Sequence, residues 1–61
     1  MYEKFASLLN KNDKTAYQVS KDTGIAQSVL SDWKTGRSNP KVDKLKILAN
    51  YFGVPIEYFL E

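Results

Sequence analysis

The residues best suited to recognition chemistry are a set of polar side chains and a neighbouring set of cations. The polar set lies at helical spacing and consists of Gln27, Ser28, Ser31 and Asp32. Between residues 34 and 46 the only acid is Asp43, whereas the cations are Lys34, Arg37, Lys41, Lys44 and Lys46. Amides and hydroxyls can bond to base edges, and clustered cations attract phosphate. The combination favours a helix inserted into a nucleic-acid groove, although scattered cations alone fit a solvated lysine face equally well.

The composition excludes most catalytic and metal-binding chemistry. The 61 residues include no cysteine and no histidine. Disulfides, thiol or imidazole metal sites, and the commonest general base and nucleophile are therefore missing. We expect no enzyme activity, no metal and no cofactor.

Size and hydropathy predict one small globular domain spanning residues 1–61. Hydrophobic residues make up 43% of the chain and charged residues 26%, an ordinary balance for such a domain. No apolar run approaches the ~20 residues of a membrane-spanning helix. The N-terminus also lacks a basic region followed by an apolar one, so we expect a cytoplasmic protein.

Apolar residues recur at helical spacing throughout, which predicts short helices and no strands. The first helix should run from Tyr2 to about Asn10. The second should begin at Thr15, which with Gln18 fits a capping box, and end at Gly24, because glycine readily adopts positive φ. The polar set belongs to a third helix, from about residue 27 to 34, that ends at Gly36.

A fourth helix, predicted from Val42 to Phe52, has the strongest helical period of the chain. Its apolar positions are Val42, Leu45, Leu48, Ala49 and Phe52. Val54-Pro55 then introduces a short fifth helix, since proline is tolerated in a first turn. We expect Ile56, Phe59 and Leu60 to pack inward, and we expect Tyr2, Tyr51 and Tyr58 to be exposed.

The helices on either side of Gly24 have the pattern of a helix-turn-helix, from about residue 15 to 35. Ser20 lies four positions before Gly24, where a small residue lets one helix approach the other closely. The predicted core of the motif is formed by Val19, Ser20, Gly24, Ile25, Leu30 and Trp33. Any helical hairpin can contain a glycine, so this spacing alone is only moderately specific.

The chain resembles the Cro/cI-type (XRE-type) helix-turn-helix DNA-binding proteins of bacteria and phages. The resemblance covers nearly the whole chain. It rests on Gly24, the run from Trp33 to Gly36, Pro40, and the pattern LxxLAxxFGV from Leu45 to Val54. It implies an all-α, compact, five-helix lambda-repressor-like domain that binds double-stranded operator DNA without a cofactor, usually as a symmetric dimer.

The resemblance also implies which residues contact DNA. Base contacts in the major groove would come from Gln27, Ser28, Val29 and Asp32. Phosphate contacts would come from Thr15, Ala16, Tyr17, Lys34, Arg37, Ser38 and Lys41. Glutamine chemistry suits adenine, serine suits several bases, and valine suits the thymine methyl group. Ile56 and Tyr58 would form a dimer contact, although they could equally well only cover the core.

Three positions depart from the family pattern. Ser20 replaces the usual alanine, and its hydroxyl can bond back to its helix. Ala26 stands where serine or threonine commonly caps the helix, a loss of about 1 kcal/mol. Asp32 places an anion towards DNA, where it could either accept from cytosine N4 or pair with Arg37 or a nearby lysine.

The sequence therefore predicts a sequence-specific transcriptional regulator, a repressor that binds a near-palindromic operator as a homodimer. The alternative is a protein-interaction module with the same helical fold, resembling an antitoxin or an antagonist. Asp32 and the low net charge of +2 favour this alternative slightly.

Overall fold

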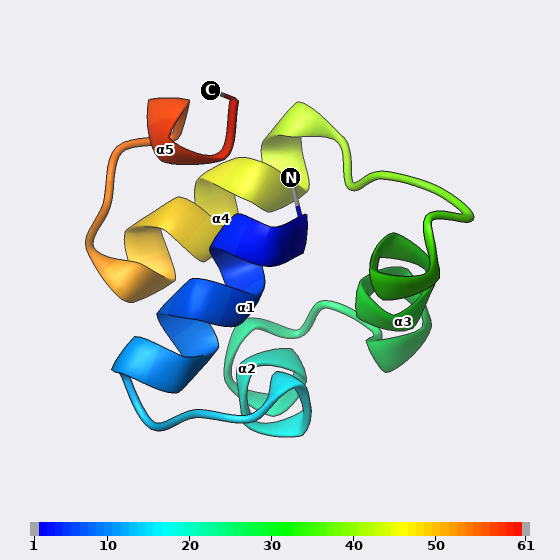
Figure 1. The fold of residues 1–61 in the computed structure, drawn as a ribbon, viewed down its shortest axis with the longest axis horizontal. Coiled ribbons are helices and arrows are strands. Elements are labelled where there is room, and N and C mark those ends of the chain that lie inside the picture. The colour runs from blue at the N-terminus through cyan, green and yellow to red at the C-terminus, as the bar shows by residue number, and fades with distance from the viewer. Residues whose placement is uncertain (1, 61) are drawn as a thin grey trace.

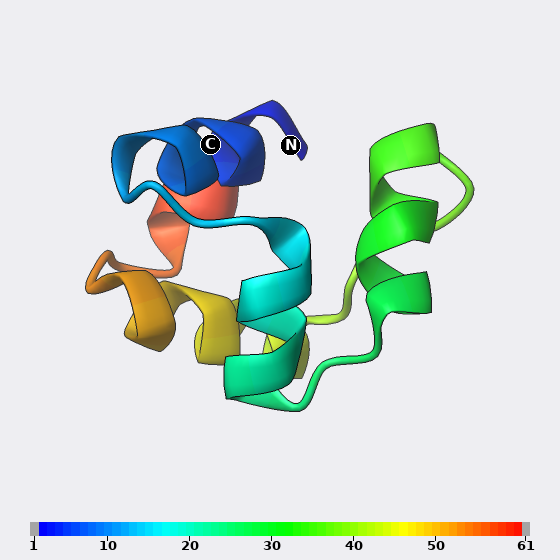
Figure 2. The same cartoon turned by 90° about the horizontal axis from the view of Figure 1, so that it is seen from below.

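The computed structural model describes residues 2–60, and these form helices joined by short connections, without a strand. The helices are α1 (Tyr2–Lys11), α2 (Ala16–Thr23), α3 (Gln27–Thr35), α4 (Val42–Phe52) and α5 (Glu57–Leu60). The predicted all-α, five-helix architecture is confirmed. Helix α5 packs on α1 and α4, and α2 packs on α3 and α4. Helix α3 lies at the edge of the molecule in both views (Figures 1 and 2), so only part of its surface is covered.

The core draws side chains from every helix. Its members are Phe5, Leu8, Val19, Ile25, Leu30, Trp33, Leu45, Leu48, Ala49 and Phe59, each at most 4% exposed. Ile25 comes from the connection between α2 and α3, so the turn of the motif is itself anchored in the core. The angle between these two helices is therefore held by apolar packing as well as by the turn.

Trp33 attaches α3 to the rest of the molecule. Its ring stacks on Phe5 with 5.2 Å between centroids, and meets Tyr2 and Phe59 edge-on at 5.6 and 6.1 Å. Aromatic pairs at such distances contribute about 0.5–1.5 kcal/mol each beyond area burial. The indole N–H is buried and has no acceptor within residues 2–60, so packing alone holds the ring.

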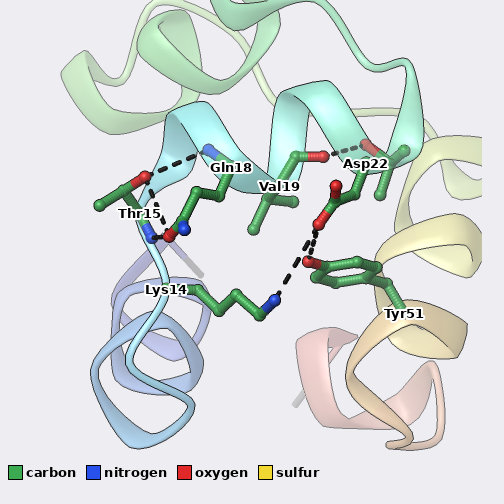
Figure 3. Close-up of polar contacts among 7 residues, drawn as sticks. Lys14, Thr15, Gln18, Val19, Asp22 and Tyr51 are labelled. Atoms are coloured by element: carbon green, nitrogen blue, oxygen red, sulfur yellow. Dashed lines mark hydrogen bonds and ion pairs between the residues drawn. The ribbon is translucent and has the colours of Figure 1, made fainter.

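Helix boundaries follow the local sequence. The predicted capping box at the start of α2 is present: the Gln18 N–H donates to Thr15 Oγ1 at 3.1 Å, and the Thr15 N–H donates to Gln18 Oε1 at 2.9 Å (Figure 3). Gly24 ends the helix with a φ of 79°, in the left-handed region that favours glycine. Most other residues would be strained by this conformation.

Two apolar residues of the predicted helices are exposed, and the prediction that Leu60 packs inward is wrong. Val42 is 59% exposed because it is the first residue of α4, one turn before Leu45 reaches the core. Leu60 is 58% exposed at the end of a four-residue helix that buries only Phe59.

The predicted exposure of three tyrosines is also wrong. Tyr2, Tyr51 and Tyr58 are half-buried against the core, since their rings cover neighbouring aromatic side chains. The exposed tyrosine is Tyr17, at 58%. Among the helices of residues 2–60, none combines the length and the apolar character needed to span a membrane.

Candidate nucleic-acid interface

Helix α3 presents a polar stripe opposite its buried one. Leu30 and Trp33 face the core, whereas Gln27, Ser28 and Ser31 are exposed. The other two predicted base-contact residues are less accessible, because Val29 and Asp32 are half-buried and Val29 packs against the core. The first turn of α3 is therefore the part of the stripe whose side chains are freest to reach a ligand.

The start of α3 carries no side-chain cap. Ala26 has an extended backbone, with φ −60° and ψ 141°, and makes no capping hydrogen bond from its side chain. The first amide groups of any helix lack partners inside the helix and carry partial positive charge. At α3 the Val29 N–H donates to the Ala26 carbonyl at 3.0 Å, which leaves the N–H groups of Gln27 and Ser28 for solvent or for an anionic ligand.

The end of α3 is organised around the Asp32 carbonyl. This oxygen accepts from the Arg37 N–H at 2.9 Å, the Ser38 N–H at 3.3 Å and the Thr35 hydroxyl at 3.2 Å. The turn passes through Gly36, whose φ is 80°. The backbone that leads into the following loop is therefore fixed by hydrogen bonds to the last turn of α3.

The Asp32 carboxylate makes no ion pair within the part of the chain that the structure describes, residues 2–60. It thus does not pair with Arg37 or a neighbouring lysine, one of the two roles considered for it. The carboxylate stays available as a hydrogen-bond acceptor.

Most predicted phosphate contacts are accessible. Those exposed beyond the polar stripe of α3 are Lys34, Arg37, Ser38 and Lys41. Lys46, by contrast, lines a shallow hollow with Val54, Pro55 and Ile56, beside the connection from α4 to α5. Within the cationic run of the sequence, Lys34 therefore belongs to α3, whereas Lys44 and Lys46 belong to α4.

The start of α2 provides a second set of amide groups. Tyr17 is exposed and Ala16 half-buried in the first turn of this helix. The Thr15 hydroxyl lies 3.4 Å from Gln18 Oε1 and accepts the Gln18 N–H, so the capping box already engages it. Any anion at this end would be bound chiefly by the backbone N–H groups of Ala16 and Tyr17.

The turn between α2 and α3 is closed by hydroxyl groups. Ser20 Oγ donates to the Ile25 carbonyl at 2.6 Å, across the turn, and not back to its own helix as expected. Thr23 Oγ1 donates to the Val19 carbonyl at 2.7 Å and accepts from the Ile25 N–H at 3.3 Å. Thr23 was not predicted, although a threonine four positions after a helical carbonyl is suited to this bond.

A polar cluster on the flank of α2 joins side chains whose contacts the sequence did not predict. Tyr51 Oη donates to Asp22 Oδ2, and Lys14 Nζ lies 4.0 Å from the same oxygen (Figure 3). The Lys14 ammonium also lies 5.6 Å from the centroid of the Tyr51 ring, in cation–π geometry. Asp22 and Tyr51 are 29 positions apart, so no local pattern could have paired them.

The residues expected at a dimer contact lie at the α5 end of the molecule. Ile56 is half-buried and lines the hollow beside Lys46. Tyr58 is held within the chain, since its hydroxyl donates to the Lys4 carbonyl at 3.4 Å and its ring lies under the Lys4 ammonium, 5.6 Å from the centroid. Exposed apolar area near this end comes instead from Leu60, at 58%.

Comparison with known proteins gives a single finding. A helix-turn-helix family model matches residues 5–59, which includes the two helices around Gly24 and most of the helices packed on them. No curated protein and no solved structure matches the chain.

Proposed function

The chain belongs to the Cro/cI-type (XRE-type) helix-turn-helix family of DNA-binding transcription regulators, and from this we propose that it is a repressor that recognises its operator sequence-specifically through the major groove. The family is a regulatory one and not a family of enzymes. The observation that carries the proposal is the surface of α3: Gln27 and Ser28 are exposed at its start, and exposed cations lie at its end and in the loop that follows. On this proposal residues 1–61 act as one domain in the cytoplasm, without a cofactor.

Base recognition is assigned to α3. Gln27 and Ser28 lie in its first turn and are exposed, and a glutamine amide can bond to adenine through a donor and an acceptor at once. Val29 would offer a methyl contact to thymine, and the unpaired Asp32 carboxylate would accept from cytosine N4. A well-formed bidentate pair discriminates between bases by about 1–3 kcal/mol.

Phosphate contact is assigned to the two ends of the motif. At the start of α2, where the helix dipole favours an anion, the Thr15 N–H is engaged by Gln18 Oε1, so the amides of Ala16 and Tyr17 are assigned to a phosphate. The other assigned contacts are exposed and lie at the end of α3 or after it: Lys34, Arg37, Ser38 and Lys41. These contacts would position the protein along the duplex without reading its sequence.

The proposed assembly on DNA is a homodimer. Ile56 borders a hollow just before α5, and Tyr58 lies within α5. A two-fold pair would place its α3 helices about 34 Å apart, one turn of the duplex, which requires a near-palindromic operator. Occupation of that site would block transcription without any chemical step.

Selection of bound sequences from a random duplex pool tests the proposal. We expect one near-palindromic sequence to be enriched and to bind about 10³-fold or more tightly than random duplex at physiological salt. Tight binding without sequence preference would contradict a sequence-specific regulator. Failure to bind duplex even at low salt would contradict DNA binding by this chain.

A second candidate function is recognition of a partner protein by the same surface. The observation that favours it is the unpaired Asp32 carboxylate, because an anion in this position repels phosphate. Two results together would support this candidate. The wild-type protein would fail to bind random duplex at low salt, and Asp32→Asn, which removes the repelling charge, would also fail to bind it.

A further inference from the structure

Lys14 is close in sequence to the proposed phosphate contacts at the start of α2, but its ammonium group is directed elsewhere. The residue immediately precedes Thr15, the cap of α2. Its side chain extends along the flank of the helix towards Asp22 and Tyr51 (Figure 3). An extended lysine at this position would otherwise be suited to reach a phosphate held by the Ala16 and Tyr17 amides.

The partners of Lys14 lie on the flank of α2 away from α3. Asp22 belongs to the last turn of α2, and Tyr51 to the C-terminal end of α4. In both views α2 lies between that end of α4 and α3 (Figures 1 and 2). The cation is therefore drawn away from the recognition helix.

Two contacts act together on the ammonium group. Lys14 Nζ lies 4.0 Å from Asp22 Oδ2 and faces the Tyr51 ring at 5.6 Å, while the Tyr51 hydroxyl holds the same carboxylate in place. The side chains of Lys14 and Asp22 are 39% and 47% exposed, so solvent weakens the ion pair. Substitution of Asp22 removes the ion pair and leaves the Tyr51 ring as the remaining contact, so the ammonium group is held less strongly.

We propose that Asp22 and Tyr51 withhold Lys14 from the DNA backbone, so that Asp22 limits the affinity of the protein for duplex of any sequence. The inference rests on the proposed function, because it requires a phosphate near the start of α2. Each phosphate neutralised by a cation adds about 0.9 to the slope of log affinity against log salt. Release of Lys14 should therefore be visible as one additional contact.

The experiment measures binding of labelled random duplex by anisotropy across a range of KCl concentrations. We expect Asp22→Asn to tighten binding at low salt and to steepen the slope by about one. We expect Lys14→Met to leave the slope unchanged, and the double variant to return to the wild-type slope. Asp13→Asn is the matched control, since it removes an acid from the neighbouring loop without freeing Lys14, and asparagine tolerates the φ of 54° at this position.

Three results would overturn the inference. Lys14→Met could flatten the wild-type slope by about one, which would mean that Lys14 already contacts DNA. Asp22→Asn could behave like Asp13→Asn, or its gain could persist in the double variant. Asp22→Ala provides a second test if Asp22→Asn proves unfolded by circular dichroism. Absence of any duplex binding by the wild-type protein would instead contradict the proposed function.

Discussion

Side chains on the two sides of Gly36 differ in the information they can carry. Gln27 and Ser28 can donate and accept in fixed directions, so bonds from them to base edges would distinguish one base from another. Arg37 carries a planar fork of donors that suits phosphate oxygens, which are the same at every base pair. Substitutions on the two sides should therefore change different properties of binding.

Gln27→Ala should reduce sequence discrimination. We expect it to weaken binding to the selected operator by about 1–3 kcal/mol and to relax the preference at one base position. Binding to random duplex should stay close to wild type, because the contact is made to a base. Competition titrations with operators altered at single positions measure both effects. An equal loss on operator and random duplex would assign Gln27 to the backbone instead.

Arg37→Ala should weaken binding to every sequence. Loss of one phosphate contact should flatten the slope of log affinity against log salt by about one on both operator and random duplex. Lys11→Ala is the control, since Lys11 is an exposed cation at the end of α1, a helix with no proposed DNA or dimer contact. A similar change of slope in both variants would show that only net charge matters.

At the scale of elements, the local sequence determines where the helices of the motif begin and end. The capping box at Thr15 and the left-handed glycine at Gly24 were predictable because each depends on neighbouring residues only. Contacts between distant segments were not, and the bond from Tyr51 to Asp22 is the clearest case. The prediction that Leu60 is buried was wrong, because periodicity alone does not show where the packing of neighbouring helices stops.

The missing cap of α3 predicts a gain of stability. Ala26→Thr places a hydroxyl where it can accept a first-turn N–H, and we expect the free energy of unfolding to rise by about 1 kcal/mol. Ala26→Val is the matched control, because valine has the shape of threonine without the oxygen. Urea unfolding followed by circular dichroism measures the difference between the two variants. Equal stabilities would mean that the hydroxyl does not cap α3.

At the scale of the whole molecule, one set of aromatic side chains joins α3 to α1 and α5. Trp33 from α3 contacts Phe5 from α1 and Phe59 from α5. The surface that we assign to DNA and the surface that we assign to the dimer are therefore parts of one packed body. Two recognition helices can keep a fixed spacing only if such rigid packing connects them to the interface.

This spacing gives a prediction for the complete complex. We expect sedimentation of the protein with its selected operator to give two copies per duplex, and we expect insertion of about 5 base pairs between half-sites, half a turn, to abolish tight binding. Insertion of about 10 base pairs would return the two half-sites to the same side of the duplex but would increase their separation, so it should also weaken binding to a rigid pair. One copy per operator, or indifference to both insertions, would contradict the homodimer.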